Sequence, residues 1–273
     1  MPGPPAPADL FATPPPAKAS HRRGWLRIVI IVGLVVAMSA GGLTIFWMVS
    51  SELGFGVFAA GAVIALLPVP FLATFFLWLD RFDPAPRRYL IFAFCWGAFV
   101  STAISLGVNT FGSFLFERAQ LPGWGVAVFV APVVEETTKA LALLLIFWFR
   151  RREIVGIADA LVYAGLAATG FAMTENILYL GKVYVSGEQM GGAIAGVGGV
   201  IGLIIFRLGM TGFIHPLFTV MTGIGVGLAA RSPRKGLRWL YPIAGLVVAM
   251  LLHGSWNLMA TFLERSQQLN LLG

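Results

Sequence analysis

The sequence predicts an all-α integral membrane protein, a polytopic helical bundle with about seven to eight transmembrane segments. Its 273 residues are 58% hydrophobic and only 11% charged, whereas a soluble globular domain carries about 25% charged residues. Apolar runs of about 20 residues, the length that crosses a bilayer as a helix, recur along the chain. These runs are continuous rather than alternating, which argues against an outer-membrane β-barrel.

Eight apolar runs define the expected helices, at residues 25–49, 55–79, 88–116, 122–149, 155–180, 191–207, 208–230 and 239–262. Residues 1–24 are rich in proline and alanine and predict a disordered cytosolic tail. A transmembrane domain at 25–263 and a short C-terminal tail at 264–273 follow. The first run is longer than the core of a signal peptide, about 7–15 residues, so we expect it to remain as a span. Cys95 is the only cysteine, which excludes a disulfide within the chain and leaves the compartment open.

Basic residues beside the runs predict the topology, since cytoplasmic loops are enriched in lysine and arginine. The N-terminus and the segments 80–89, 150–153 and 231–238 are expected in the cytosol, and 181–190 outside. Two full spans between 191 and 230 would place 231–238 outside, so one of them should not cross. The glycine-rich segment 191–206 is the expected half-span or re-entrant segment. Because the net charge of +7 is spread over these short loops, we expect the lipid bilayer as a partner and no nucleic acid.

Polar side chains, most of them ionisable, interrupt the later runs. Glu135, Glu136 and Lys139 lie in one run, Asp159 and Glu175 in the next, and His215, His253 and Asn257 in the last two. Each ionisable group at bilayer depth costs at least about 2.5 kcal/mol. So many costly groups are explained either by a function or by structural ion pairs between them.

Helical spacing brings several of these groups together. Lys139 follows Glu136 by three residues and Glu135 by four, so its ammonium reaches either carboxylate on one helix face. One carboxylate then remains without a cationic partner. Either the pair is structural and the second glutamate is protonated or paired elsewhere, or the second glutamate is a general base. His253 and Asn257 share a face in the same way. At about 1.5 Å per residue, Glu135 and His253 each lie about 22 Å from the nearest cytosolic arginines, and Glu175 about 34 Å, so the site is expected in the outer half of the bilayer.

Four short motifs resemble one known family. "EETTK" at 135–139, "FAMTE" at 171–175, the histidine of "HPLFT" and "HGSWN" at 253–257 look like the ordered EExxK, FxxxE, His and HxxxN motifs of the PrsW intramembrane proteases. That family is related to CAAX prenyl endopeptidases and bacteriocin-processing membrane proteases. The resemblance covers residues 55 to 262. Ala85 stands where a second glutamate is typical, which affects a loop contact rather than the chemistry.

The resemblance implies an intramembrane endopeptidase that hydrolyses a membrane-anchored protein substrate, by site-1-type cleavage of a protein such as an anti-sigma factor, in a bacterial plasma membrane. Glu135 or Glu136 is the expected general base and Lys139 balances the other carboxylate. His253 and Asn257 orient water or donate to the oxyanion, and Glu175, His215 and Phe171 complete the cavity.

Two alternatives remain open. One is a zinc hydrolase with Glu175, His215 and His253 as ligands, although the chain has no HExxH motif. Hydrolysis by glutamate alone is preferred over it. The other is a proton-coupled transporter with a Glu/His/Lys relay, against which the sequence shows no internal repeat.

Overall fold

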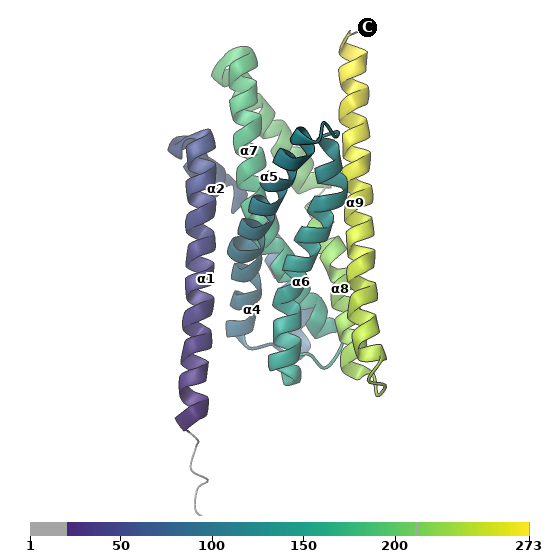
Figure 1. The fold of residues 1–273 in the computed structure, drawn as a ribbon. Coiled ribbons are helices and arrows are strands. Elements are labelled where there is room, and N and C mark those ends of the chain that lie inside the picture. The colour runs from purple at the N-terminus through teal and green to yellow at the C-terminus, as the bar shows by residue number, and fades with distance from the viewer. Residues whose placement is uncertain (1–20, 211, 273) are drawn as a thin grey trace, which may run out of the picture. The chain divides into compact units, whose positions relative to one another are not determined.

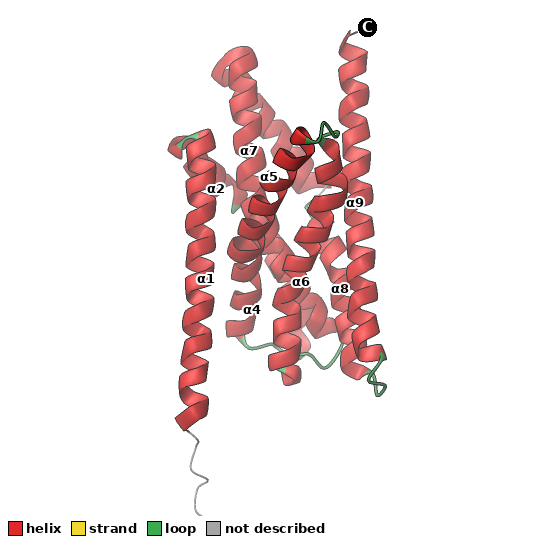
Figure 2. Ribbon diagram, in the orientation of Figure 1, coloured by secondary structure: helices red, strands yellow, loops and turns green. Residues whose placement is uncertain are grey.

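The computed structural model describes residues 21–210 and 212–272, and these residues are almost entirely helical with no strand among them (Figure 2). The predicted all-α membrane bundle is confirmed. The helices are α1 His21–Leu53, α2 Phe55–Ala65, α3 Val69–Leu79, α4 Arg87–Cys95, α5 Thr102–Arg118, α6 Ala131–Phe149, α7 Ile157–Ile204, α8 Ile214–Arg231 and α9 Leu237–Leu272. Short π segments, η2 Trp96–Ser101, η3 Val126–Val130 and η5 Ile205–Met210, join some of them, as do the 3₁₀ turns η1 Asp80–Phe82 and η4 Arg151–Glu153.

The two predicted tails, 1–24 and 264–273, lie only partly within the described residues. Residues 1–20 and residue 273 lie outside the described residues, while 21–24 already belong to α1 and helix α9 continues through Leu272. The chain divides into two units, 1–36 and 37–273. The described part of the first unit is the N-terminal stretch of α1, and everything that follows concerns the second unit.

Helix α7 is the centre of the second unit. It contacts α2, α3, α4, α6, α8 and η2 (Figure 1), and most of its residues from Ala160 to Gly181 are buried. Two glycines permit the closest approach. A Cβ at Gly97 would collide with the carbonyl oxygen of Ala167, and one at Gly170 with the carbonyl oxygen of Phe94. Backbone therefore packs on backbone, which fixes η2 against α7.

Several predicted spans are divided in the structure. The run 55–79 breaks at 66–68 into α2 and α3, where Pro68 and Pro70 cannot donate backbone hydrogen bonds. The run 88–116 continues from α4 through η2 into α5. Among the described residues, five segments are long and apolar enough to cross a membrane, and α6, which carries three ionisable residues, is not one of them.

The expected outside loop at 181–190 is helical instead. Helix α7 continues through it and breaks at Gly191 and Gly192, where Gly192 adopts a φ of 76° that other residues rarely reach. The chain then turns back, so that Gly196 packs against Tyr184. Segment 193–210 and α8, which begins at Ile214, together pass once along the bundle (Figure 1). Whether segment 191–206 crosses the bilayer only in part stays a prediction.

The three basic segments expected in the cytosol lie at one end of the bundle, at the bottom of Figure 1. Arg231 at the end of α8 donates through Nε to the carbonyl oxygen of Val155, 3.4 Å away, which ties segment 231–238 to the loop that follows 150–153. We call this end the basic end. Which side of the membrane it faces stays a prediction.

Candidate active site

Ionisable side chains from four helices meet inside the second unit, around the carboxylates of α6. Helix α6 contributes Glu135, Glu136 and Lys139, α7 contributes Phe171 and Glu175, α8 begins one residue before His215, and α9 carries His253. The three charged residues of α6 and both histidines are at most 8% exposed. The sequence therefore identified residues that the fold brings together from positions more than 100 residues apart.

Glu136 is fully buried and its carboxylate has three partners. Its Oε1 accepts a hydrogen bond from Lys139 Nζ at 2.9 Å and lies 3.0 Å from His253 Nδ1. Its Oε2 accepts from Thr219 Oγ1 at 2.8 Å. These contacts join α6, α8 and α9, and they orient the His253 ring with Nδ1 as the donor.

Glu135 is bonded far less completely. Its Oε1 accepts from Asn109 Nδ2 at a long 3.3 Å. Its Oε2 is buried and has no hydrogen-bond partner among the described residues; the nearest cationic groups are Lys139 Nζ at 3.7 Å and His253 Nε2 at 3.8 Å. A buried oxygen of this kind is costly unless a water, a substrate or a cation completes its bonding.

Lys139 is the cation at the centre of the cluster, and it is fully buried. Besides the two glutamates, its Nζ lies 3.5 Å from His215 Nδ1 and 3.9 Å from the centre of the Phe171 ring. The aromatic face stabilises the ammonium of this buried side chain. Phe171 thus acts on the site through Lys139.

Glu175 forms a second ion-paired group next to the first. Its Oε2 lies 2.8 Å from His215 Nε2 and 2.9 Å from Arg207 Nη2. Arg207 also stacks on the Tyr179 ring, with its guanidinium carbon 4.2 Å from the ring centre. Because His215 donates from Nε2 to this carboxylate, its Nδ1 is left as an acceptor facing Lys139.

Asn257 and Asp159 have other partners. The Asn257 amide donates to the carbonyl oxygen of Ala127 at 2.8 Å and so ties α9 to η3. Asp159 accepts from the backbone N–H groups of Val155 and Gly156 at 2.8 and 3.0 Å, which caps the N-terminus of α7. Neither contact places the side chain on a carboxylate of α6.

Three partners of the cluster were not found from the sequence: Asn109, Arg207 and Thr219. Thr219 follows His215 by four residues and so shares its helix face, a spacing that could have identified it. Arg207 ends a glycine-rich run, so in the sequence it looks like one of the basic residues that commonly flank a transmembrane segment. Asn109 lies alone in its run, and no spacing connects it to the other motifs.

Three side chains of the cluster fit a metal ion. Glu135, His215 and His253 each offer one ligand atom, and these atoms lie within 4.8 Å of one another. The sequence had proposed Glu175 with the same two histidines, but here Glu175 supports His215 from its other ring nitrogen. Glu136 supports His253 in the same way. A carboxylate on the second nitrogen is the usual support of a metal-binding histidine.

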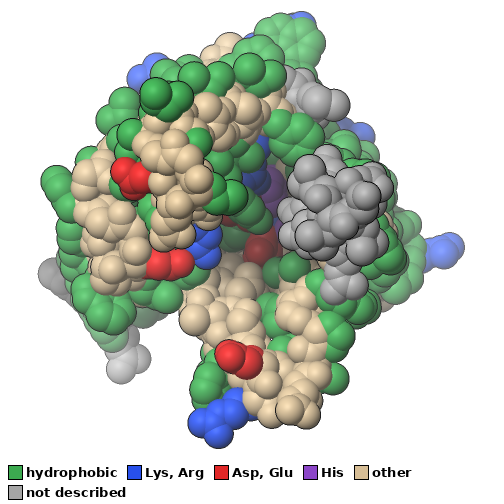
Figure 3. Space-filling view, turned by 90° about the horizontal axis from the view of Figure 1, so that it is seen from above, with side chains coloured by type: hydrophobic (Ala, Val, Ile, Leu, Met, Phe, Trp, Pro, Cys, Tyr) green, Lys and Arg blue, Asp and Glu red, His purple; other side chains and the backbone are tan. Residues whose placement is uncertain are grey.

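The cluster also lies where water can reach it. Seen from the end opposite the basic end, the molecule is hollowed at its centre, and histidine, acidic and basic side chains are visible inside the hollow (Figure 3). Carboxylates and imidazoles that surround an unsatisfied oxygen, in a bundle of membrane-length helices open to water, define an intramembrane hydrolase.

Comparisons with known proteins agree with that class. The model of the "PrsW family intramembrane metalloprotease" matches residues 85–272, more than half of the chain. The chain belongs to this family and is a protease of the membrane.

Two relatives carry the name Protease PrsW. The protein of Clostridioides difficile (strain 630) is 27% identical over 195 residues, covering 71% of this chain and 76% of the relative. That of Bacillus subtilis (strain 168) is 26% identical over 213 residues, covering 77% and 85%. No solved structure matches the chain. Family membership favours the protease over the transporter alternative.

Proposed function

We propose that the chain hydrolyses a peptide bond of a membrane-anchored protein, and that Glu135 is the carboxylate that acts on the attacking water. The observation that carries the proposal is the unsatisfied Glu135 Oε2, which faces Lys139 at 3.7 Å and His253 Nε2 at 3.8 Å. A general base needs a lone pair that no other group already occupies. Glu135 has one in the middle of the cluster.

Glu136 is the weaker candidate for the base. Lys139, His253 and Thr219 occupy its two oxygens at 2.8–3.0 Å. Taking a proton would require at least one of these bonds to break in a site without exposed surface. We assign Glu136 to holding Lys139 and the His253 ring in place, with His253 Nε2 free to bind water or substrate.

The donor set fits a divalent metal held by Glu135, His215 and His253. The unsatisfied Glu135 oxygen and the two carboxylate-supported rings are the features that such a site requires. The charges agree as well, because the carboxylates Glu135, Glu136 and Glu175 exceed the two fixed cations by one. With a metal in place, Glu135 would be a ligand rather than the free base, and a metal such as zinc would supply a Lewis acid that polarises a carbonyl group and acidifies water.

A metal-free version is supported by a different observation. Lys139 Nζ lies 3.5 Å from His215 Nδ1 and 3.7 Å from Glu135 Oε2, so an ammonium already provides positive charge between two of the three donors. In this version Glu135 alone removes the proton from water, and His253, protonated on both ring nitrogens, donates from Nε2 to the oxyanion that forms. Metal analysis of active protein separates the two versions.

The hollow opposite the basic end supports access for water, and the surrounding apolar helices support a substrate that enters from the bilayer. Site-1-type cleavage of a single-span protein such as an anti-sigma factor is supported by the family resemblance alone. We also propose that the N-terminus and the basic end face the cytosol of a bacterial cell, because positive loops are retained on that side.

The test is cleavage of a single-span membrane substrate in vesicles, normalised to folded enzyme. Glu135→Gln keeps the shape of the side chain, and loss of a general base lowers the rate by about 10²–10⁴-fold while the protein stays folded. Glu188→Gln is the matched control, because this glutamate lies outside the cluster and bonds only Tyr184 among the contacts described. Cleavage at the wild-type rate by Glu135→Gln would exclude Glu135 as the reacting carboxylate.

A further inference from the structure

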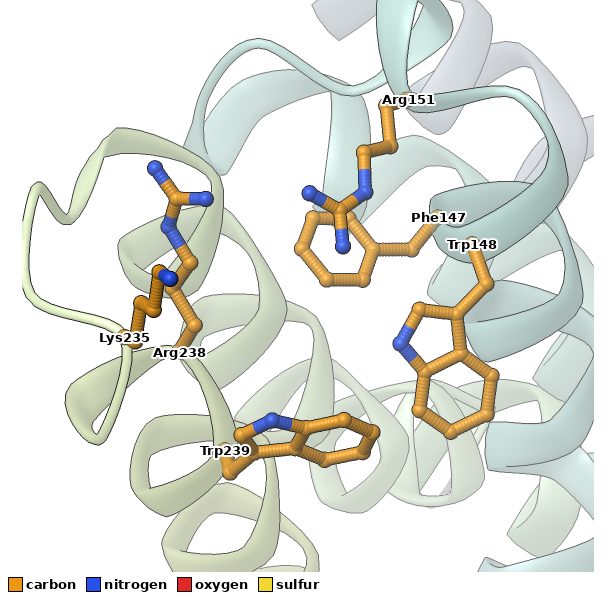
Figure 4. Close-up of a pocket in the computed structure, with 6 residues that line it drawn as sticks. All are labelled: Phe147, Trp148, Arg151, Lys235, Arg238 and Trp239. Atoms are coloured by element: carbon orange, nitrogen blue, oxygen red, sulfur yellow. The ribbon is translucent and has the colours of Figure 1, made fainter.

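A second cavity lies at the basic end, apart from the Glu/His cluster. It measures about 250 Å³ and lies where the end of α6 and η4 meet the start of α9 and the loop before it. We call it the interfacial pocket. Its lining residues are Phe147, Trp148, Arg151, Lys235, Arg238 and Trp239 (Figure 4).

Half of these lining residues are cations, and no carboxylate lines the pocket. None of Arg151, Lys235 and Arg238 forms an ion pair with an acidic residue among the described residues. Arg238 Nε donates to the carbonyl oxygen of Ser232 at 2.8 Å, which fixes the guanidinium and leaves its other N–H groups for a ligand. Three unpaired cations around one cavity attract an anion.

The other half of the pocket is aromatic. The Trp148 and Trp239 rings lie 5.3 Å apart, centre to centre, and are 41% and 59% exposed. Figure 4 shows the cationic groups toward one side of the pocket and the two indole rings toward the other. Beyond Trp239, Leu240 and Ile243 continue an exposed apolar surface along α9. A ligand in this pocket therefore meets positive charge at one end and a lipid-facing wall at the other.

We propose that the interfacial pocket binds an anionic phospholipid, with its phosphate on Arg151, Lys235 and Arg238 and its acyl chains along Trp148 and Trp239. Arginine forks match the geometry of phosphate oxygens, and basic pockets between membrane helices hold anionic headgroups. Tryptophans and basic residues are common at membrane interfaces in general. What distinguishes this place is that three cations without acidic partners share one cavity with two adjoining indoles.

The position of the pocket relates it to the catalytic cluster. Helix α6 carries Glu135 twelve residues before Phe147, and α9 carries His253 fourteen residues after Trp239. A bound lipid would join the basic ends of the two helices whose other halves supply the reacting groups. The proposal concerns binding and does not depend on the proposed proteolytic mechanism.

The experiment measures lipid binding to the purified full-length protein by native mass spectrometry and by thermal unfolding in detergent. Phosphatidylglycerol is the probe, phosphatidylcholine the neutral comparison, and inorganic phosphate the soluble comparison. The triple variant Arg151→Gln/Lys235→Gln/Arg238→Gln is expected to bind phosphatidylglycerol about 100-fold more weakly, from the contribution of three basic side chains near a membrane surface. Thermal protection by phosphatidylglycerol should fall in parallel.

The matched control is Arg81→Gln/Arg87→Gln/Arg88→Gln, which removes three charges at the basic end without touching the pocket. It is expected to bind phosphatidylglycerol like wild type. The variant Arg151→Lys/Arg238→Lys keeps the charge and should retain most of the binding, even if the glutamine variant folds poorly. Equal weakening by the control triple, equal binding of phosphatidylcholine, or equal protection by inorganic phosphate would each overturn the assignment.

Discussion

Lys139 is the residue whose removal the structure predicts to be most damaging to stability. It is fully buried, and its Nζ lies 2.9 Å from Glu136 Oε1 and 3.7 Å from Glu135 Oε2. Lys139→Met keeps the length of the side chain but leaves two adjacent carboxylates without their shared cation. Removing one partner of a buried ion pair costs about 3–5 kcal/mol, which is a factor of about 10²–10⁴ in the folding equilibrium.

That loss is large compared with the total stability of a domain, about 5–15 kcal/mol. We expect less folded Lys139→Met protein in the membrane and a lower unfolding midpoint in detergent. The matched control is Lys182→Met. Lys182 pairs with Glu52 at 3.6 Å, but both side chains are 56% exposed, and such a pair contributes about 0–1 kcal/mol.

A double variant tests whether unpaired carboxylates are the cause of the stability loss in Lys139→Met. Lys139→Met/Glu136→Gln removes the stranded charge that lies closest to the ammonium, so part of the stability should return. Coupling of about 0.5–3 kcal/mol is usual for residues in direct contact. Unfolding of Lys139→Met at the wild-type midpoint, or a double variant less stable than the single one, would refute this account of the cluster.

Three further outcomes are expected. If a metal is held at the site, purified protein carries close to one divalent ion per chain, and His253→Ala loses that ion. Chelation then abolishes cleavage and added zinc restores it. Full activity of metal-depleted protein would instead support hydrolysis by Glu135 alone. In a Cys95→Ala background, Arg234→Cys should resist an impermeant thiol reagent added to intact cells while Met190→Cys reacts, and the reverse pattern would invert the topology. Arg234 and Met190 are suited to this because both are exposed, whereas Ser232 in the same loop is buried. Gly97→Ala should destabilise the protein by about 1–3 kcal/mol, because its Cβ would meet the Ala167 carbonyl. Gly107→Ala, which has open space inside α5, should keep or raise the thermal unfolding midpoint, since alanine favours a helix over glycine by about 0.5–1 kcal/mol.

The helices were largely predictable from the sequence because the bilayer imposes a length and a composition on each of them. The breaks within the runs were less so. Gly191 and Gly192 break α7 after a segment polar enough to be taken for a loop. The backbone hydrogen bonds of a helix form within the helix itself, in water as in lipid, so the polarity at 181–190 does not mark the end of the helix.

The residues of the candidate site were predictable from the sequence, but which side chains pair with one another was less so. Helical spacing identified Glu135, Glu136 and Lys139 as neighbours, but spacing within one helix cannot say which carboxylate receives His253. The tertiary packing decides that, since α9 brings His253 Nδ1 to Glu136 and leaves Glu135 Oε2 unsatisfied. Asn257 shows the same limit, because its amide donates to a backbone carbonyl of η3.

The shared bonds of Glu136 have a consequence for how the protein matures. Helices can insert into a bilayer one by one before they associate, and Glu136 accepts from Lys139 on its own helix, Thr219 on α8 and His253 on α9. Until those three helices have met, His253 has no carboxylate to orient it and Glu135 has no histidine opposite it. We propose that a newly inserted chain therefore lacks a complete hydrolytic centre and does not cleave neighbouring membrane proteins until its own helices have associated.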